Sequence, residues 1–182
     1  MQRFITLAFN TLLLLSLNAA TPETHYTVIV SLDGFRWDYP DMYKTPNLDR
    51  MAADGVKAVM LPSYPASTFP NHYTLATGLV PDHHGIINNT FWDVKNRRQY
   101  SMGDSATRNN PEYYLGEPIW ITAQKQGVKT GNMYWVGSDI AIKKSHPTYY
   151  RPWNAKPFLT FEQRIDTVLT WLQKPEPERP RP

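Results

Sequence analysis

The residue best placed for chemistry in this sequence is a threonine at the start of a predicted helix. Thr68 follows a strand-like apolar run at residues 56–61, and residues 71–77 are predicted to form a helix that Gly78 ends. A hydroxyl at this position would lie beside unpaired backbone N–H groups and the positive end of the helix dipole, where phosphate binds well. The position also suits a simple N-cap residue, so Thr68 alone does not decide between the two roles.

An aspartate at the end of the first predicted strand is the natural partner for this threonine. Residues 26–32 form a short, β-branched apolar run, which predicts a strand buried on both faces, and Asp33 follows it. Ligands of open α/β sheets bind at this carboxyl end, and carboxylates suit hard or borderline metal ions. Because Thr68 follows the next strand of the same β-α-β unit, we expect both side chains at one edge. A metal ion there would activate the threonine hydroxyl as a nucleophile, although Asp33 and Gly34 can also simply form a turn.

Further polar candidates follow the predicted helix. His83 and His84 are adjacent, and neighbours point to opposite faces of a strand or lie about 100° apart on a helix, so one metal ion rarely binds both. Capping and packing are the favoured roles for these two histidines. Asn89 can donate an amide hydrogen bond to an oxyanion, or it can serve as a turn residue.

The order of the predicted elements indicates an α/β fold with a mostly parallel central sheet and flanking helices. The β-α-β pattern of residues 26–61 continues into the helix after Thr68, and a polar, turn-rich segment follows. Near the end of the chain, apolar residues at helical spacing predict an amphipathic helix. The other predicted elements are a helix at 45–54, a hairpin at 91–100, a helix at 118–126, a strand at 128–136, a proline-containing loop at 143–158 and the amphipathic helix at 161–173.

Composition and the N-terminal segment indicate a globular, exported protein. The chain has 182 residues, of which 41% are hydrophobic, so residues 21–182 can form one domain with a sizeable core. Residues 1–20 look like a secretory signal peptide, which predicts a secreted or periplasmic protein; an uncleaved anchor is the alternative. No later run approaches the roughly 20 apolar residues of a membrane span. The net charge is only +3 and the basic residues are scattered, so no nucleic-acid-binding surface is expected. The absence of cysteine excludes disulfides and thiol chemistry.

A long, ordered set of motifs resembles the nucleotide pyrophosphatase/phosphodiesterase family of the alkaline phosphatase superfamily. The resemblance covers nearly everything from residue 26 to about residue 180, and it implies an alkaline-phosphatase-like α/β fold. The segments that carry it are 29–36, 45–51, 67–89, 116–120, 135–139 and 161–169.

This resemblance implies a phosphodiesterase that uses two zinc ions and a covalent phospho-threonine intermediate. Asp33 is then a zinc ligand, Thr68 is the nucleophile whose oxygen also binds that zinc, and Asn89 hydrogen-bonds a phosphoryl oxygen. Two metal ions at such a site stabilise the entering and the leaving oxygen of an in-line displacement. Phe69 and Trp153 match the positions of aromatic residues that stack on the two faces of a nucleotide base, although Trp153 can also simply pack in its proline-rich loop. The residues that match other substrate-pocket positions are Arg108, Trp135 and Asp139.

The resemblance includes only part of the family's metal site. The family's remaining zinc ligands lie further downstream, so Asp33 and Thr68 alone represent the metal site, whereas a zinc site needs three or four protein ligands. We therefore expect the chain to be the N-terminal part of a catalytic domain, with an incomplete sheet that exposes an edge. The aromatic pair favours a nucleotide substrate. The alternatives are a phospholipid or choline phosphodiester, or a secreted non-catalytic fragment that keeps only the phosphate site.

Overall fold

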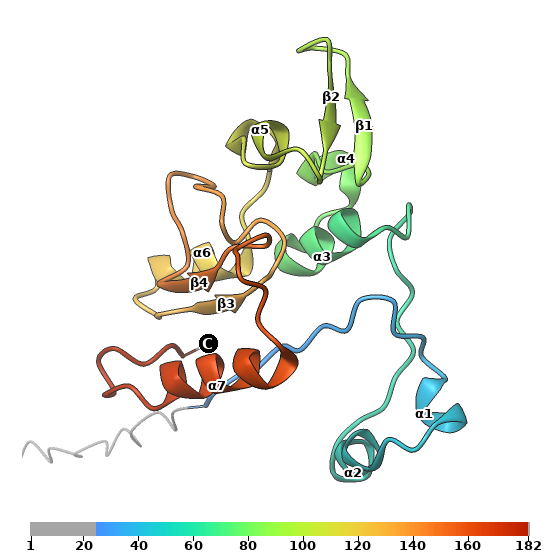
Figure 1. The fold of residues 1–182 in the computed structure, drawn as a ribbon, viewed down its shortest axis with the longest axis vertical. Coiled ribbons are helices and arrows are strands. Elements are labelled where there is room, and N and C mark those ends of the chain that lie inside the picture. The colour runs from blue at the N-terminus through green and yellow to red at the C-terminus, as the bar shows by residue number, and fades with distance from the viewer. Residues whose placement is uncertain (1–24, 182) are drawn as a thin grey trace, which may run out of the picture.

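The computed structural model of the chain describes residues 25–181 and shows short helices and strands joined by long loops (Figure 1). The predicted signal peptide at residues 1–20 lies outside the described residues. The elements, in chain order, are α1 (Tyr39–Met42), α2 (Pro46–Asp54), α3 (Thr68–Thr77), α4 (Pro81–His84), β1 (Thr90–Asp93), β2 (Arg98–Ser101), α5 (Ser105–Arg108), the 3-10 helix η1 (Pro111–Tyr113), α6 (Ile119–Lys125), β3 (Gly131–Met133), β4 (Tyr149–Arg151) and α7 (Phe161–Leu172).

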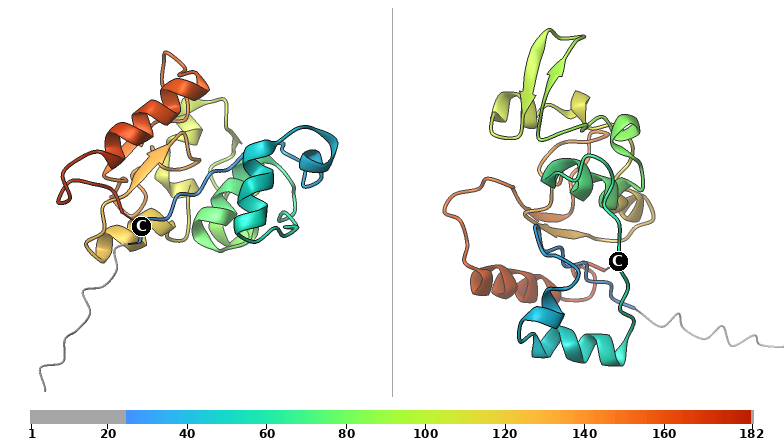
Figure 2. Two further views of the ribbon diagram at one scale, coloured as in Figure 1. Left: turned by 90° about the horizontal axis from the view of Figure 1, so that it is seen from below. Right: turned by 90° about the vertical axis from the view of Figure 1, so that its right-hand side faces the viewer.

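The strands of the described residues form two separate two-stranded sheets. Strands β1 and β2 pair antiparallel, which confirms the predicted hairpin. Strands β3 and β4 pair in parallel, with Gly131 opposite Tyr149, and this sheet lies between α6 and α7 (Figure 1 and Figure 2). Strand β4 falls inside the segment 143–158 that the sequence predicted as a loop. A strand of three residues is too short to show the alternation that marks a strand in a sequence.

Two predicted strands are not formed. Residues 26–32 and 56–61 have no strand assignment, and their side chains are exposed rather than buried on both faces. Val30 is 75% exposed and Leu61 is 88% exposed. A strand requires a neighbouring strand to share its backbone hydrogen bonds, and no strand among residues 25–181 pairs with either run. The predicted strand at 128–136 is likewise reduced to the three residues of β3, where β4 provides a partner.

The predicted helices are present with small changes at their ends. Helix α7 begins with a capping box, in which Thr160 accepts the N–H of Gln163 and the Gln163 side chain accepts the N–H of Thr160. Its apolar stripe does not enter the core, because Phe161 and Ile165 are 71% and 59% exposed. Within residues 25–181, none of the helices combines the length and apolar character that crossing a membrane requires.

An aromatic core surrounds α3 and holds it in place. Tyr73 of α3 is fully buried, packs edge to face on Tyr114 at 5.3 Å, and donates a hydrogen bond to the backbone carbonyl of Leu115 at 3.0 Å. Burial raises the pKa of the Tyr73 phenol well above its ordinary value. Helices α1 and α2, in contrast, bury none of their residues. The core consists of Phe69, Tyr73, Ala76, Ile86, Tyr100, Tyr113, Tyr114, Trp120, Ile121, Val136, Ile140 and Ile142.

Candidate active site

The structure brings the predicted aspartate and threonine into direct contact. Thr68 is the first residue of α3, and its hydroxyl donates a hydrogen bond to Oδ2 of Asp33 at 3.1 Å. The extended run before Asp33 delivers the carboxylate to this position without forming a sheet. Asp33 is exposed and Thr68 is half-buried, so a ligand can approach the pair from solvent. We call these two residues the dyad.

Asn89 supports the helix start from a distance in sequence. Ser67 is the N-cap of α3 but makes no side-chain capping bond. Instead, the N–H of Phe69 donates to Oδ1 of Asn89 at 2.9 Å. Because an N–H can only donate, the side-chain oxygen of Asn89 must face it, and the Nδ2 hydrogens remain for another acceptor. The side chain of Thr68 therefore contacts Asp33 rather than capping the helix, and Asn89 satisfies one of the N–H groups expected to face phosphate.

Asn71 fixes the loop that leads into α3. Its Oδ1 accepts the N–H of Ser63 at 2.8 Å, and its Nδ2 donates to the backbone carbonyls of Pro65 at 2.9 Å and Ser67 at 3.0 Å. One helical side chain thus ties down both ends of the segment 63–67. This role could not be predicted from the sequence, because an asparagine within a predicted helix carries no signal of such contacts.

We expect Asn71→Ala to lower the free energy of unfolding by about 2–4 kcal/mol, because several part-buried hydrogen bonds are lost and their partners stay unpaired. Urea denaturation checks the prediction. Asn71→Asp separates the two roles: it keeps the oxygen that accepts from Ser63 but turns a carboxylate oxygen toward the carbonyls of Pro65 and Ser67, so its loss should be at least as large as that of alanine. Equal stability of Asn71→Ala and the wild type would contradict this role.

The adjacent histidines have separate environments, and only that of His84 agrees with the favoured packing role. His84 is fully buried, with Nδ1 accepting the N–H of Ile86 at 3.2 Å and Nε2 bonded to the Thr74 hydroxyl at 3.0 Å. Since Nδ1 accepts, the proton of the neutral ring lies on Nε2. His83 is exposed. Burial lowers the pKa of His84, so the folded protein favours its neutral form.

This environment predicts a stability loss in mild acid. Below pH 6.5 the unfolded chain takes up a proton at His84 that the folded protein resists. The free energy of unfolding therefore decreases as the pH is lowered, by up to about 1.4 kcal/mol per pH unit. Urea denaturation from pH 7.5 to pH 5 measures the slope. His84→Gln should lose this part of the pH dependence, whereas His83→Gln, at the exposed neighbour, should retain it. Identical slopes for both variants would contradict the assignment.

The two predicted base-stacking residues, Phe69 and Trp153, contact each other directly. Phe69 is only 1% exposed, and its ring meets Trp153 edge to face at 5.3 Å with an interplanar angle of 87°. The base-wide gap expected between the two rings is therefore closed, because edge-to-face packing brings aromatic rings together favourably. A base would have to separate them or stack on the outer side of Trp153, which is half-buried.

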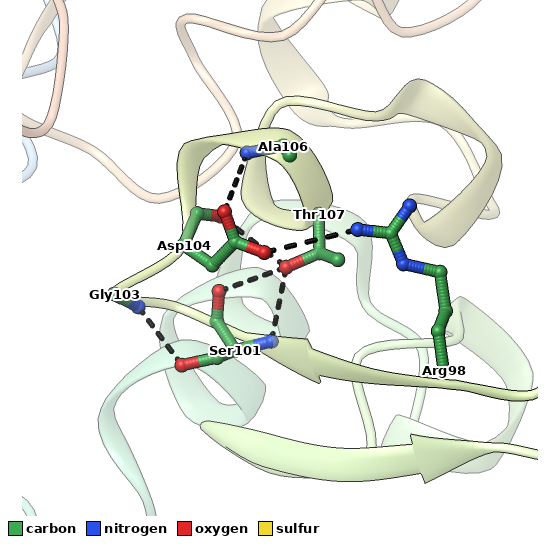
Figure 3. Close-up of polar contacts among 6 residues, drawn as sticks. All are labelled: Arg98, Ser101, Gly103, Asp104, Ala106 and Thr107. Carbon is green, nitrogen blue, oxygen red and sulfur yellow. Dashed lines mark hydrogen bonds and ion pairs between the residues drawn. The ribbon is translucent and has the colours of Figure 1, made fainter.

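Arg108 is held inside the core by the turn after the hairpin. The buried Thr107 hydroxyl accepts the N–H of Ser101 at 3.1 Å and donates to its carbonyl at 3.1 Å, while Asp104 caps α5 through the N–H of Ala106 at 2.9 Å (Figure 3). Arg108 is only 3% exposed and donates through Nη1 to the backbone carbonyl of Met102 at 2.8 Å. A substrate would reach this guanidinium only if the residues that cover it moved.

Asp139 and Trp135 lie in the segment after β3. Burial raises the pKa of Asp139, and backbone hydrogen bonding and the positive charge of Arg108 partly offset this shift. The Trp135 indole N–H donates to the backbone carbonyl of His72 at 3.1 Å. Hydrogen bonds join Asp33 and Asn89 to the first turn of α3, whereas Trp135 bonds to the backbone of His72 further along the helix.

His72 is a residue of this site that the sequence analysis missed. Its ring bonds through Nδ1 to the carbonyl of Thr68 at 2.8 Å and through Nε2 to the hydroxyl of Ser31 at 2.9 Å. A histidine four residues after the predicted nucleophile shares a helix face with it, and this spacing was the available signal.

The dyad offers oxygen donors that suit part of a metal site. A carboxylate and a hydroxyl 3.1 Å apart at an accessible position can both contact one cation. No group of three or more His, Cys, Asp or Glu side chains within residues 25–181 is arranged to hold a metal ion. The described residues therefore fit two positions of a divalent-metal site rather than a complete one.

Comparisons with known proteins identify relatives of this chain. It is 43% identical over 156 residues to bovine ectonucleotide pyrophosphatase/phosphodiesterase family member 3, a match that covers 84% of the chain and 18% of the bovine protein. It is 44% identical over 161 residues to human family member 1, which covers 87% of the chain and 17% of the human protein. The chain therefore spans less than a fifth of the length of these curated relatives.

A solved structure and a family model agree with these matches. The solved structure is that of murine ectonucleotide pyrophosphatase/phosphodiesterase 5, described as an inactive threonine-to-alanine variant in complex with AMP. It has a TM-score of 0.77 and 33% identity, and the match covers 86% of this chain and 41% of the murine chain. The predicted fold class is thereby confirmed: a mixed α/β chain that corresponds to part of that fold. Residues 27–181 match the family model described as type I phosphodiesterase/nucleotide pyrophosphatase, and the chain belongs to this family.

Proposed function

We propose that this chain is the N-terminal part of the catalytic domain of an enzyme that hydrolyses phosphodiester or pyrophosphate bonds of nucleotides. The observation that carries the proposal is the 3.1 Å hydrogen bond between Thr68 Oγ1 and Asp33 Oδ2 at the N-terminus of α3. This bond supports the proposal because the hydroxyl lies next to a carboxylate at a helix end that favours phosphate, as a threonine nucleophile requires. The names of the curated relatives support the same reaction class.

In this proposal Thr68 is the nucleophile. Its hydroxyl proton, which is directed at Asp33, passes to solvent as its oxygen attacks phosphorus. The bond from phosphorus to the leaving oxygen breaks, and that oxygen takes up a proton from water. Water then hydrolyses the phospho-threonine and restores the hydroxyl. A divalent ion, which we propose to be zinc, would be held by Asp33 and Thr68 with donors beyond those described, and would supply Lewis acidity at this step. The murine relative described as inactive carries an alanine in place of a threonine, which agrees with a threonine nucleophile.

The substrate proposal rests on Asn89 and the aromatic residues. The Nδ2 hydrogens of Asn89 are available to a phosphoryl oxygen, because its Oδ1 is bonded to Phe69. We propose that Phe69, Trp135 and Trp153 shape the nucleotide pocket, with Arg108 and Asp139 behind them. The AMP bound to the murine relative supports a nucleotide rather than a lipid. The names of the relatives and the N-terminal sequence favour a secreted or periplasmic location.

The test is hydrolysis by the full-length gene product, with zinc content measured on the same sample. We expect release of p-nitrophenol from the p-nitrophenyl ester of thymidine monophosphate, and little from p-nitrophenyl phosphocholine. Preference for the choline ester would replace the nucleotide by a phospholipid-type substrate. No hydrolysis of either ester by a folded, zinc-supplied protein would overturn the proposal and favour a non-catalytic protein.

Asn89→Ala should lower kcat about 10²–10³-fold, the usual cost of removing one oxyanion donor. Steady-state kinetics with the thymidine ester measure this loss. Because Asn89 also accepts from Phe69 N–H, Asn89→Asp is an informative control. It keeps the acceptor for the helix but replaces the donor by a negative oxygen, so it should be at least as impaired in turnover while preserving stability better than alanine. Full activity of Asn89→Asp would exclude the donor role.

A further inference from the structure

We propose that His72 is a positioning residue that sets the spacing between Asp33 and Thr68, and this inference rests on the proposed role of that dyad. The His72 ring lies between the backbone of Thr68 and the side chain of Ser31, two residues before Asp33. It thus joins the helix that carries the hydroxyl to the segment that carries the carboxylate.

The hydrogen-bond partners fix the form of the ring. The carbonyl of Thr68 can only accept, so Nδ1 of His72 carries the proton that it donates at 2.8 Å. In the neutral ring Nε2 then accepts from the Ser31 hydroxyl at 2.9 Å. The indole of Trp135 packs edge to face against the ring at 5.7 Å and donates to the backbone carbonyl of His72 at 3.1 Å. The position of the His72 ring is therefore fixed by hydrogen bonds at both ring nitrogens and by the packing of Trp135 against it.

The segment that carries Asp33 depends on these bonds for its position. Residues 26–32 are exposed and pair with no strand among the described residues. Two side-chain hydrogen bonds within the described part of the chain join this segment to α3: Ser31 to His72 and Thr68 to Asp33. The start of the segment is anchored elsewhere, because Arg179 donates to the hydroxyl of Tyr26 at 3.0 Å. Without the bond of Ser31 to His72, only the bond of Thr68 to Asp33 would be left of these two links to α3. Residues that orient metal ligands in this way typically change metal affinity 10–100-fold when removed.

Zinc titration of the full-length gene product, with Zn²⁺ alone as the probe, tests the inference. We expect His72→Ala and Ser31→Ala each to weaken zinc binding about 10–100-fold and to lower kcat more than they raise KM. The double variant should be no weaker than His72→Ala, because both changes remove the same bond. His72→Asn should retain part of the affinity, since its amide can still donate to the Thr68 carbonyl and holds the helix end.

His84→Gln is the matched control, because His84 is a buried histidine that bonds α3 through Thr74 and, within residues 25–181, makes no side-chain hydrogen bond to the Asp33 segment. It should lower the melting temperature and leave zinc affinity unchanged. Equal weakening of zinc binding by His84→Gln would reduce His72 to a general stabilising role and overturn the inference. Wild-type zinc affinity in His72→Ala would overturn it as well. If His72→Ala does not fold, Ser31→Ala and His72→Asn provide the same readout.

The two proposals fail in different ways. If Thr68→Ala remains active, the dyad mechanism is wrong whatever His72 does. If Thr68→Ala is inactive while His72→Ala and Ser31→Ala bind zinc normally, the positioning role alone is wrong.

Discussion

Thr68→Ala is expected to lower kcat by about 10³-fold or more and to leave the fold and bound metal largely in place. Loss of a nucleophile removes the covalent route altogether, and the residual rate then comes from the remaining groups of the site. The stability cost should be about 1 kcal/mol, because one hydrogen bond to an exposed carboxylate is lost. Steady-state kinetics, zinc content and thermal unfolding of one preparation measure all three quantities.

Thr68→Ser is the matched control, because it keeps a hydroxyl that can donate to Asp33. It should retain measurable turnover and form a phospho-serine that can be trapped by acid quenching. Turnover of Thr68→Ala within a few-fold of the wild type would exclude Thr68 as the nucleophile.

Asp33→Asn is expected to weaken zinc binding by more than about 100-fold, since losing the charged carboxylate ligand, unlike losing the neutral hydroxyl of Thr68, should exceed the 10–100-fold cost of losing an outer partner. The amide keeps the shape of the side chain but removes the negative charge that a divalent ion requires. The kcat should fall together with zinc occupancy. Equilibrium titration with Zn²⁺ and kinetics at saturating zinc separate binding from turnover.

Asp38→Asn provides the control for charge alone. Asp38 belongs to the same N-terminal segment, and its bond with Arg36 lowers its pKa, but it does not contact Thr68. It should leave zinc affinity unchanged. Equal zinc affinity in Asp33→Asn and Asp38→Asn would show that Asp33 is not a ligand.

Local sequence signals predicted the helices and the juxtaposition of the dyad well. Proline near the first turn and glycine after the last turn mark α2, and glycine in a left-handed conformation ends α3 at Gly78 with φ of 69°. The β-α-β pattern correctly placed Asp33 beside Thr68, although the strands of that pattern are absent from the described residues. Asp33 still contacts Thr68 because the α3 side chains of Thr68 and His72 bond directly to Asp33 and Ser31.

The parts that the sequence did not predict depend on partners far along the chain. An apolar run such as 26–32 predicts a strand only if a neighbour pairs with it, and periodicity contains no information about that neighbour. The bonds of His72 to Ser31 and of Asn89 to Phe69 span 41 and 20 residues. Phe69 and Trp153 are still further apart in the sequence. The resemblance identifies both residues but does not tell whether their rings contact each other.

The exposed run before Asp33 has a consequence for how activity is lost. Segments with few buried contacts open locally at a smaller free-energy cost than the core around them. Val28, Val30 and Leu32 are 60%, 75% and 49% exposed, whereas Tyr73 of α3 is fully buried. The amides of the run will therefore exchange with deuterated solvent well before those of α3. Heat inactivation can accordingly precede the melting of the aromatic core, so that a folded fluorescence signal does not guarantee an intact dyad.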